Sequence, residues 1–228
     1  KGVYSEPIYY TQVIDYEGRT LLQKDPVQKQ VYSPETIFIM NDMLADVVTR
    51  GTGYPEGIVK YTTTVTDAKG KEKETTVTIP SAGKTGTTDE NKDKWFCGYT
   101  PYYVGAAWYG YDTGTNLASD EYNNAKVLWG KVMTQIHQDL PSKPFFEAAP
   151  ANLVKATICV DSGLRPSSLC ANDPRGSRVR EEWFIKGTEP GPEDVCNVHY
   201  TVKIDLTQQD ALGRNLPANE YCPFELTA

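Results

Sequence analysis

The sequence predicts a mixed α/β fold of the α+β type, in which helices pack on an antiparallel sheet and a small β-rich tail follows. Runs of β-branched and aromatic residues recur with turn residues between them, which is typical of strands joined by hairpins. Residues 34–50 and 125–140 repeat apolar side chains at helical spacing. Beyond residue 146 the chain becomes rich in Ala and Pro and then in cysteine-bearing loops.

The composition indicates a folded protein that does not bind nucleic acid. The 228 residues are 39% hydrophobic and 23% charged, which is enough apolar material for a core. A net charge of -7 and a pI near 5.0 leave no basic stripe for phosphates. Residues 1–4 lack the pattern of a signal peptide, and residues 6–10 resemble a strand with no preceding element to pair with. We therefore expect a fragment of a longer protein.

The amino-terminal part predicts a hairpin followed by a helix. Residues 6–10 resemble a strand, and residues 8–14 and 20–23 predict a hairpin with Gly18 at its turn. Ser33 and Pro34 form a cap and first-turn pair for a helix that ends at Gly51. Its core face is predicted to consist of Ile37, Met40, Leu44, Val47 and Val48.

The middle of the chain predicts the main sheet. Residues 58–79 form two Thr/Val-rich strands around a charged turn at 67–71. The strand that follows delivers Lys84, and residues 95–99 and 104–111 predict an antiparallel pair. A long amphipathic helix covering this sheet is expected from Ala125, Leu128, Trp129, Val132, Met133, Ile136 and Leu140.

This helix is expected to end at Pro141 and Pro144, with His137 partly exposed. The change of composition places a domain boundary near residues 141–150. We therefore expect one domain over residues 1–140 and a tail over residues 141–228, with tail strands near 183–185 and 198–204.

The segment Lys84-Thr85-Gly86-Thr87 carries the chemistry of the chain. An ammonium and two hydroxyls on one strand edge can bind a carboxylate, and a backbone N–H near Thr87 can polarise a carbonyl that is under attack. Gly86 lets a substrate backbone approach closely. The predicted catalytic residues are Lys84 and Thr87, and the predicted substrate-binding residues are Lys84, Thr85, Gly86 and Thr87. No metal and no cofactor are expected there.

Five motifs in order resemble the carboxyl-terminal half of the transpeptidase domain of class A penicillin-binding proteins. They are Gly2-Val3-Tyr4-Ser5-Glu6-Pro7, Val47-Val48-Thr49-Arg50-Gly51-Thr52-Gly53, Ala82-Gly83-Lys84-Thr85-Gly86-Thr87-Thr88, Asp93-Lys94-Trp95-Phe96-Cys97-Gly98-Tyr99-Thr100-Pro101 and Trp108-Tyr109-Gly110-Tyr111-Asp112. The tail resembles the same proteins in the segment from Phe184 to Pro190 and in Cys196 and His199.

The resemblance implies part of the penicillin-recognising serine-transferase fold and a role in a peptidoglycan D,D-transpeptidase. In such an enzyme a serine is acylated by a stem peptide, the terminal D-alanine leaves, and an amine of a neighbouring strand takes the acyl group. β-Lactams would acylate the same serine. The resemblance implies that Lys84 supports proton movement, that Thr85 and Thr87 bind the carboxylate, and that the Thr87 N–H completes the oxyanion hole.

The nucleophilic serine is missing, so we expect this chain to be inactive alone. Ser81 and Lys84 form a literal Ser-x-x-Lys, but the odd spacing on a strand sends their side chains to opposite faces. Tyr122-Asn123-Asn124 resembles the second motif of the family, yet it lies at a helix start, where Asn is an ordinary cap.

The implied partners are the amino-terminal half of the same protein, stem peptides and β-lactams. The resemblance places the full-length protein outside the cytoplasm, anchored in the membrane by an amino-terminal segment absent from this sequence. The alternative function is a non-catalytic module that binds cell-wall material or a protein partner. A β-lactamase is a third possibility, but the long hairpin, the Gly51-Thr52-Gly53 loop and the cysteine-bearing tail do not resemble that family.

Five cysteines pose separate questions. Cys97 lies in an apolar strand and is expected to be a buried, inert thiol. Four others lie in the tail, namely Cys159, Cys170, Cys196 and Cys222. Two disulfides, with Cys159–Cys170 closing the shortest loop, are one interpretation. Zinc held by three thiolates and His199 is a second interpretation, and free thiols are a third.

Overall fold

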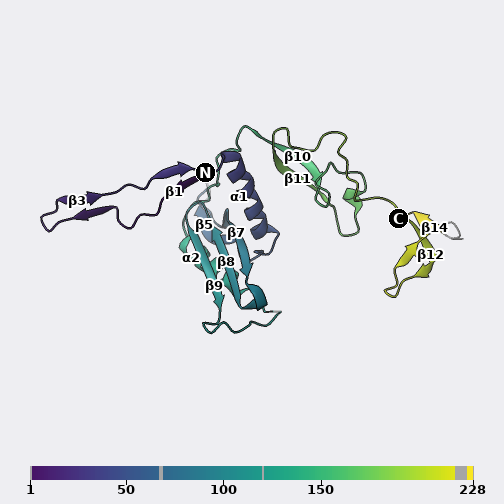
Figure 1. Cartoon of the computed structure of the whole chain (residues 1–228), viewed down its shortest axis with the longest axis horizontal. Helices are drawn as coiled ribbons and strands as arrows, with labels where there is room; N and C mark the ends of the chain where they lie inside the picture. Colours follow the sequence, from purple (N-terminus) through teal and green to yellow (C-terminus); the bar gives the residue numbers. More distant parts are fainter. Residues whose placement is uncertain (1, 67–68, 120, 219–224, 228) are drawn as a thin grey trace. The chain divides into compact units, whose positions relative to one another are not determined.

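The computed structural model describes residues 2–66, 69–119, 121–218 and 225–227. The chain forms two compact units, residues 1–150 and 151–228. The first unit holds helices α1 and α2 and strands β1 to β9, and the second holds strands β10 to β14 (Figure 1). The strand ladders are antiparallel, so the predicted mixed α/β class with antiparallel sheets is confirmed.

The amino-terminal segment is a two-stranded ribbon built from two short ladders. β1 (Val3–Ser5) pairs with β4 (Gln28–Gln30), and β2 (Gln12–Ile14) pairs with β3 (Thr20–Gln23). Gly18 has a positive φ of 81°, as the predicted turn requires. The hairpin is therefore confirmed.

The prediction of a strand over residues 6–10 is wrong. The ladder breaks there, between β1 and β2. Pro7 has no N–H to give to a partner strand, and Tyr9 is fully exposed, so nothing holds this stretch in a sheet.

Helix α1 (Pro34–Thr49) begins as predicted. The Ser33 hydroxyl accepts the N–H of Thr36 at 3.2 Å, and Pro34 occupies the first turn, where its missing N–H costs nothing. The helix closes at Arg50, whose N–H bonds to the carbonyl of Asp46. α1 contacts β7, the strand that carries Lys84.

Strands β5 (Val59–Thr66) and β6 (Glu72–Ile79) form the second predicted hairpin. Gly70 has a φ of 76° in its turn, whereas Asp67 and Ala68 lie outside the described residues. A three-stranded sheet follows, made of β7 (Ala82–Thr87), β8 (Asp93–Tyr99) and β9 (Val104–Gly110) in that order.

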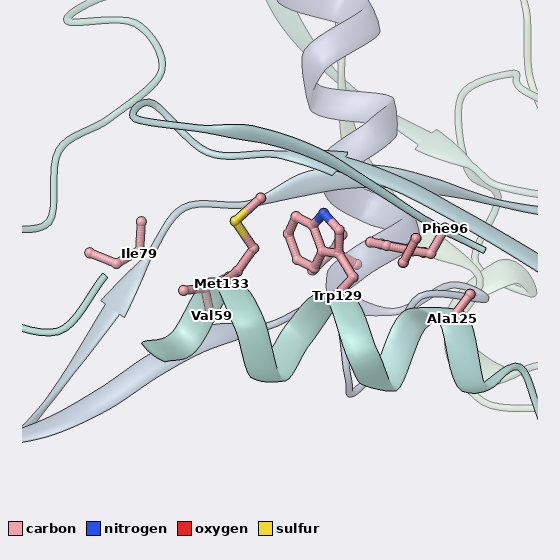
Figure 2. Close-up of a cluster of buried hydrophobic side chains, with 8 residues drawn as sticks. Val59, Ile79, Phe96, Ala125, Trp129 and Met133 are labelled. Carbon is pink, nitrogen blue, oxygen red and sulfur yellow. The ribbon is translucent and has the colours of Figure 1, made fainter. Parts of the chain in front are cut away.

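Helix α2 (Asn124–Ile136) covers one face of this sheet. The Asn123 side chain accepts the N–H groups of Ala125 and Lys126, which confirms the predicted cap. Figure 2 shows Ala125, Trp129 and Met133 rising from the helix towards the strands. The buried cluster consists of Val48, Val59, Ile79, Phe96, Ala107, Ala125, Trp129 and Met133.

The end of α2 differs from the expectation. The helix stops at Ile136 instead of continuing to Leu140, and Asp139 takes a left-handed conformation at φ 68°. His137 caps the helix and is fully buried, so its expected partial exposure is wrong. Its two ring nitrogens lie 2.6 Å from the carbonyl of Met133 and 2.8 Å from the hydroxyl of Thr100. These polar contacts hold the imidazole inside the unit.

Cys97 is exposed, so the buried thiol expected there is wrong. Side chains alternate along β8, and Phe96 and Gly98 face α2 while Cys97 faces the other side of the sheet. Because α2 covers only one face, the thiol on the other face stays accessible.

The second unit is small and loop-rich. β10 (Leu153–Cys159) pairs with β11 (Val179–Ile185), and β12 (Lys203–Gln209) lies between β13 (Asn215–Pro217) and β14 (Glu225–Thr227). The strand expected at residues 183–185 is confirmed as part of β11. The strand expected at 198–204 begins only at Lys203, because residues around His199 form a loop.

Candidate functional site

Strand β7 is an edge strand of its sheet. It pairs in register with β8 from Ala82 opposite Tyr99 to Thr87 opposite Lys94. Within the described ranges its other edge pairs with no strand, so it presents backbone N–H and C=O groups to an incoming chain. This is the geometry that main-chain recognition of an extended peptide requires.

The four predicted site residues share this edge but not one face. Lys84 and Thr87 are exposed, and Thr85 and Gly86 are half-buried. The register places Lys84 opposite Cys97 and Thr85 opposite Phe96, so the ammonium and the two hydroxyls lie on opposite sides of the sheet. A ligand could therefore contact the ammonium and the hydroxyls together only by binding at the edge of β7.

Local contacts fix Thr85 and Gly86. The Thr85 hydroxyl lies 2.7 Å from the hydroxyl of Thr52, in the loop that follows α1. The Lys84 ammonium donates to the carbonyl of Thr85 at 3.0 Å. A Cβ on Gly86 would lie 3.1 Å from the Cβ of Trp95, so a larger residue would press on β8.

Asp93 holds the turn after β7. Its carboxylate accepts the indole N–H of Trp108 at 2.8 Å and the Thr88 hydroxyl at 2.7 Å. These two hydrogen bonds, the one from Trp108 foremost, lower the pKa of Asp93 below its ordinary value. The carboxylate therefore stays ionised near neutral pH and pins Thr88, the residue next to Thr87.

An ion pair between Lys126 and Glu56, called the clamp below, lies next to the loop that carries Thr52. This pair was not predicted from the sequence. The Lys126 ammonium on α2 lies 3.0 Å from the Glu56 carboxylate and donates to the carbonyls of Thr52 and Tyr54 at 3.3 and 3.4 Å. The Tyr122 hydroxyl also donates to Glu56. The Lys126 side chain is only 9% exposed. Lys126 thus ties α2 to the loop whose Thr52 positions Thr85.

The pKa values of the clamp follow from its contacts. Burial favours neutral Glu56, but hydrogen bonds from Tyr122 and Lys126 outweigh it and lower the pKa. Burial likewise favours neutral Lys126, but the hydrogen bond with Glu56 and the attraction between their charges raise its pKa. Both groups are therefore charged across the neutral range.

We expect Lys126→Met to lower the free energy of unfolding by about 1.5–3 kcal/mol, because it leaves a charge-assisted network without its donor. Stability from the depressed Glu56 pKa is present above the ordinary value of 4.5 and is lost as pH falls. The difference from wild type should therefore be constant near pH 7 and shrink in acid, measured by urea titration at several pH values. Lys131→Met, an exposed lysine on the same helix, is the control and should change little.

Comparison with known proteins decides the family. Residues 1–128 match the family model of the penicillin binding protein transpeptidase domain, and residues 149–201 match the model of the penicillin-binding protein 1A carboxyl-terminal domain. The chain belongs to the penicillin-binding protein transpeptidase family. The predicted resemblance is therefore confirmed, and all five motifs lie within the first match.

Individual relatives agree with this assignment. The chain is 36% identical over 220 residues to penicillin-binding protein 1A of Clostridium perfringens and 38% identical over 217 residues to that of Clostridium novyi. These alignments cover 96% and 95% of this chain but 24% and 23% of the relatives. The chain thus spans about a quarter of the length of these relatives.

A solved structure agrees on the fold. Penicillin-binding protein 1A from Haemophilus influenzae superimposes with a TM-score of 0.57 at 21% identity, over 83% of this chain and 30% of the other. The penicillin-binding fold expected from the sequence is therefore confirmed.

In this penicillin-binding protein domain, Ser81 and Asn123 are engaged in structural contacts. Ser81 is buried, and its hydroxyl donates to the carbonyl of Gly57 at 2.8 Å. Asn123 caps α2 and donates to the carbonyl of Trp95 at 3.2 Å. Both side chains are thus engaged in hydrogen bonds within the fold.

Metal-ligand side chains gather in the second unit, away from the predicted site residues in sequence. Cys159, Cys170, Cys196 and His199 each offer one ligand atom, and these atoms lie within 4.8 Å of one another. The described thiols are free, so the structure does not form the disulfide between Cys159 and Cys170 that was one of the three interpretations. Cys222, the fourth tail cysteine, lies outside the described residues.

Of the helices in the described part of the chain, none has the length and apolar character needed to span a membrane.

Proposed function

We propose that residues 1–140 are the carboxyl-terminal half of a peptidoglycan D,D-transpeptidase domain and that residues 141–228 form a separate tail domain. The observation that carries the proposal is the open edge of β7, where Lys84, Thr85, Gly86 and Thr87 stand in a chain of the penicillin-binding protein family. Family membership supplies the reaction class, and the edge supplies a place for the peptide.

The donor stem peptide would lie along β7 as an added strand, because this edge offers main-chain partners. The Lys84 ammonium would stabilise negative charge on one side of the sheet, while Thr85 and Thr87 would hydrogen-bond the terminal carboxylate from the other side. The Thr87 N–H would donate to the oxygen on which charge develops during attack. Thr52 would act as a positioning residue through its hydroxyl contact with Thr85.

The serine nucleophile would come from polypeptide that precedes residue 1 in the longer protein. Its oxygen attacks the carbonyl of the penultimate residue, the peptide bond to the terminal D-alanine breaks, and the leaving amine takes a proton. An amine of a neighbouring stem peptide then attacks the ester and releases the serine with its proton restored. A β-lactam would enter the same path through opening of its ring and would stop at the ester.

The first unit leaves an apolar surface that this preceding polypeptide would cover. Val104 on β9 and Leu128, Val132 and Ile136 on α2 are exposed, and β9 is the other edge of the described sheet. A shallow hollow between β9 and α2 is lined by Gly105, Ala107, Trp108 and Met133, among others. We propose that the amino-terminal half of the domain pairs with β9 and packs on α2, which buries these side chains.

The same longer protein would reside outside the cytoplasm, held to the membrane by a segment before residue 1. Peptidoglycan strands are its substrates there, and no nucleic acid is involved. No cofactor is required, because proton transfer and charge stabilisation come from side chains and backbone N–H groups.

Fluorescent penicillin tests the proposal. The full-length protein should form a covalent, heat-stable adduct on one serine, whereas the 228-residue chain should form none, because Ser81 is buried and hydrogen-bonded to Gly57. Labelling is measured by in-gel fluorescence and intact mass.

Two outcomes would contradict the proposal. An adduct on the isolated chain that maps to Ser81 would overturn the assignment of the nucleophile to preceding polypeptide. A full-length protein that binds peptidoglycan but takes no label would favour the non-catalytic module.

A further inference from the structure

The second unit brings four soft ligand atoms together from three separate places in the chain. Cys159 ends β10, Cys170 opens a 3-10 turn over residues 170–172, and Cys196 and His199 lie in the loop after β11. Cys159 and Cys170 are fully buried and Cys196 is 7% exposed. Three buried thiols and one imidazole have thus been placed on a common centre.

The spacing between His199 and two of the thiols fits a tetrahedron around zinc. The Nδ1 atom of His199 lies 3.3 Å from the Cys196 sulfur and 3.5 Å from the Cys159 sulfur. Zinc–sulfur and zinc–nitrogen bonds of about 2.3 and 2.0–2.1 Å at tetrahedral angles give a nitrogen–sulfur edge of roughly 3.6 Å. We propose that Cys159, Cys170, Cys196 and His199 bind one zinc ion in a closed, structural site.

The orientation of His199 supports this assignment. Its Nε2 atom lies 2.9 Å from a carboxylate oxygen of Asp173 and 3.2 Å from one of Asp161. A proton on Nε2 is therefore shared with these acids, which leaves the Nδ1 lone pair directed at the thiols. A carboxylate behind a histidine is the usual support for a metal-binding imidazole, since it fixes the tautomer and the ring orientation.

A competing site would hold a cation between the carboxylates of Asp161 and Asp173 and the Nε2 atom of His199. The neighbouring charges disfavour this site. Arg175 contacts Asp161 at 2.7 Å and Asp173 at 2.8 Å, and Arg178 contacts Asp161 at 2.8 Å. Two guanidinium groups already neutralise the carboxylates, so a further cation there would meet like charge. The thiol side of His199 faces no such cation in the contacts described.

Hydrogen bonds around Cys170 suit a thiolate. The Ser167 N–H donates to the Cys170 sulfur at 3.3 Å, and the Ser167 hydroxyl lies 3.4 Å from it. Donors aimed at sulfur stabilise the negative charge that a metal-bound cysteine carries.

The second unit has too small a core to be stable without a cross-link. Its described buried apolar side chains are Leu153, Ile158 and the three cysteines, and Val179 packs against the cysteine cluster. β10 and β11 form a two-stranded ladder, which is marginal by itself in water. Small domains with so little core are usually held by a metal or by disulfides, and a metal here would supply folding free energy directly.

The test is the zinc content of the 228-residue chain, purified with a reductant from zinc-supplemented culture. We expect one zinc per chain by elemental analysis and all five thiols free after chelation and denaturation. Cobalt in place of zinc should give the intense visible bands of a tetrahedral thiolate site. Cys170→Ser and His199→Gln should lose stoichiometric zinc, and Asp173→Asn should weaken zinc affinity about 10–100-fold.

Two cysteines outside the four ligands provide matched controls. Cys97→Ser removes an exposed thiol of the first unit, and Cys222→Ser removes the remaining tail thiol, and both variants should keep one zinc. Zinc loss in either variant would overturn the assigned ligand set.

Other results would overturn the site itself. A folded wild-type chain without zinc, or a Cys159–Cys170 disulfide found by peptide mapping of the freshly prepared protein, would do so. Should Cys170→Ser fail to fold, X-ray absorption of the wild-type zinc protein decides the matter. A shell of three sulfurs and one nitrogen supports the proposal and any other shell overturns it. None of these readouts depends on penicillin labelling.

Discussion

Replacing Lys84 by alanine in the full-length protein is expected to slow acylation by penicillin by about 10²–10³-fold, the cost of removing one donor aimed at developing charge. Lys84 is exposed on the edge strand, and its ammonium donates to the neighbouring Thr85 carbonyl. The side chain is therefore held at the edge while remaining open to a ligand. The second-order rate constant for fluorescent penicillin measures the effect.

The controls separate chemistry from folding. Lys60→Ala removes an exposed lysine near the start of another strand, β5, and should leave the rate unchanged. Lys84→Arg keeps the charge but changes its geometry, so an intermediate rate is expected. Because Lys84 is exposed, its removal should leave the thermal midpoint within a degree or so of wild type. Acylation of Lys84→Ala at the wild-type rate would refute the role proposed for this residue.

Local signals predicted most elements of the first unit. Ser33 with Pro34, Asn123, Gly18 and Gly70 each act within one turn of the chain, so their effects depend little on distant residues. The order of the three-stranded sheet also followed, because consecutive strands joined by short turns pair with each other. These features needed no knowledge of tertiary packing.

The failures involve side chains whose surroundings come from elsewhere in the chain. His137 follows Met133 by four residues and so continues the core-facing stripe of α2, a signal of burial that the sequence contained. Lys126 precedes Trp129 by three residues on the same stripe, so a buried partner for its charge was to be expected. That this partner is Glu56 depends on the fold of the loop after α1.

The site was predicted only in part, because some of its contacts join residues that are far apart in the sequence. The segment from Lys84 to Thr87 was found from its composition, but the alternation of its side chains across the sheet follows from the register with β8. The contact between Thr52 and Thr85 joins residues 33 positions apart, and nothing local in the sequence indicates it. The convergence of the tail thiols on His199 likewise required the loops to be folded.

Trp129→Ala is expected to lower the free energy of unfolding of the first unit by about 3–5 kcal/mol. The indole is 3% exposed and packs edge-on against Phe96 with ring centroids 5.0 Å apart. Figure 2 labels both side chains in the buried cluster. Its N–H donates to the carbonyl of Gly105 at 3.1 Å. Truncation removes this hydrogen bond and leaves a cavity under β8 and β9, because Gly98 and Gly105 have no side chains to fill it.

The effect should reach the site through Phe96, which lies opposite Thr85 in the ladder between β7 and β8. Urea titration of the 228-residue chain followed by far-ultraviolet circular dichroism gives the stability, and hydrogen exchange of the β7 and β8 amides gives the local effect. Leu128→Ala, the preceding residue on the same helix, is 52% exposed and should cost less than about 1 kcal/mol. If both substitutions cost the same, α2 does not pack on the sheet through Trp129, and the described core does not support the Lys84 edge.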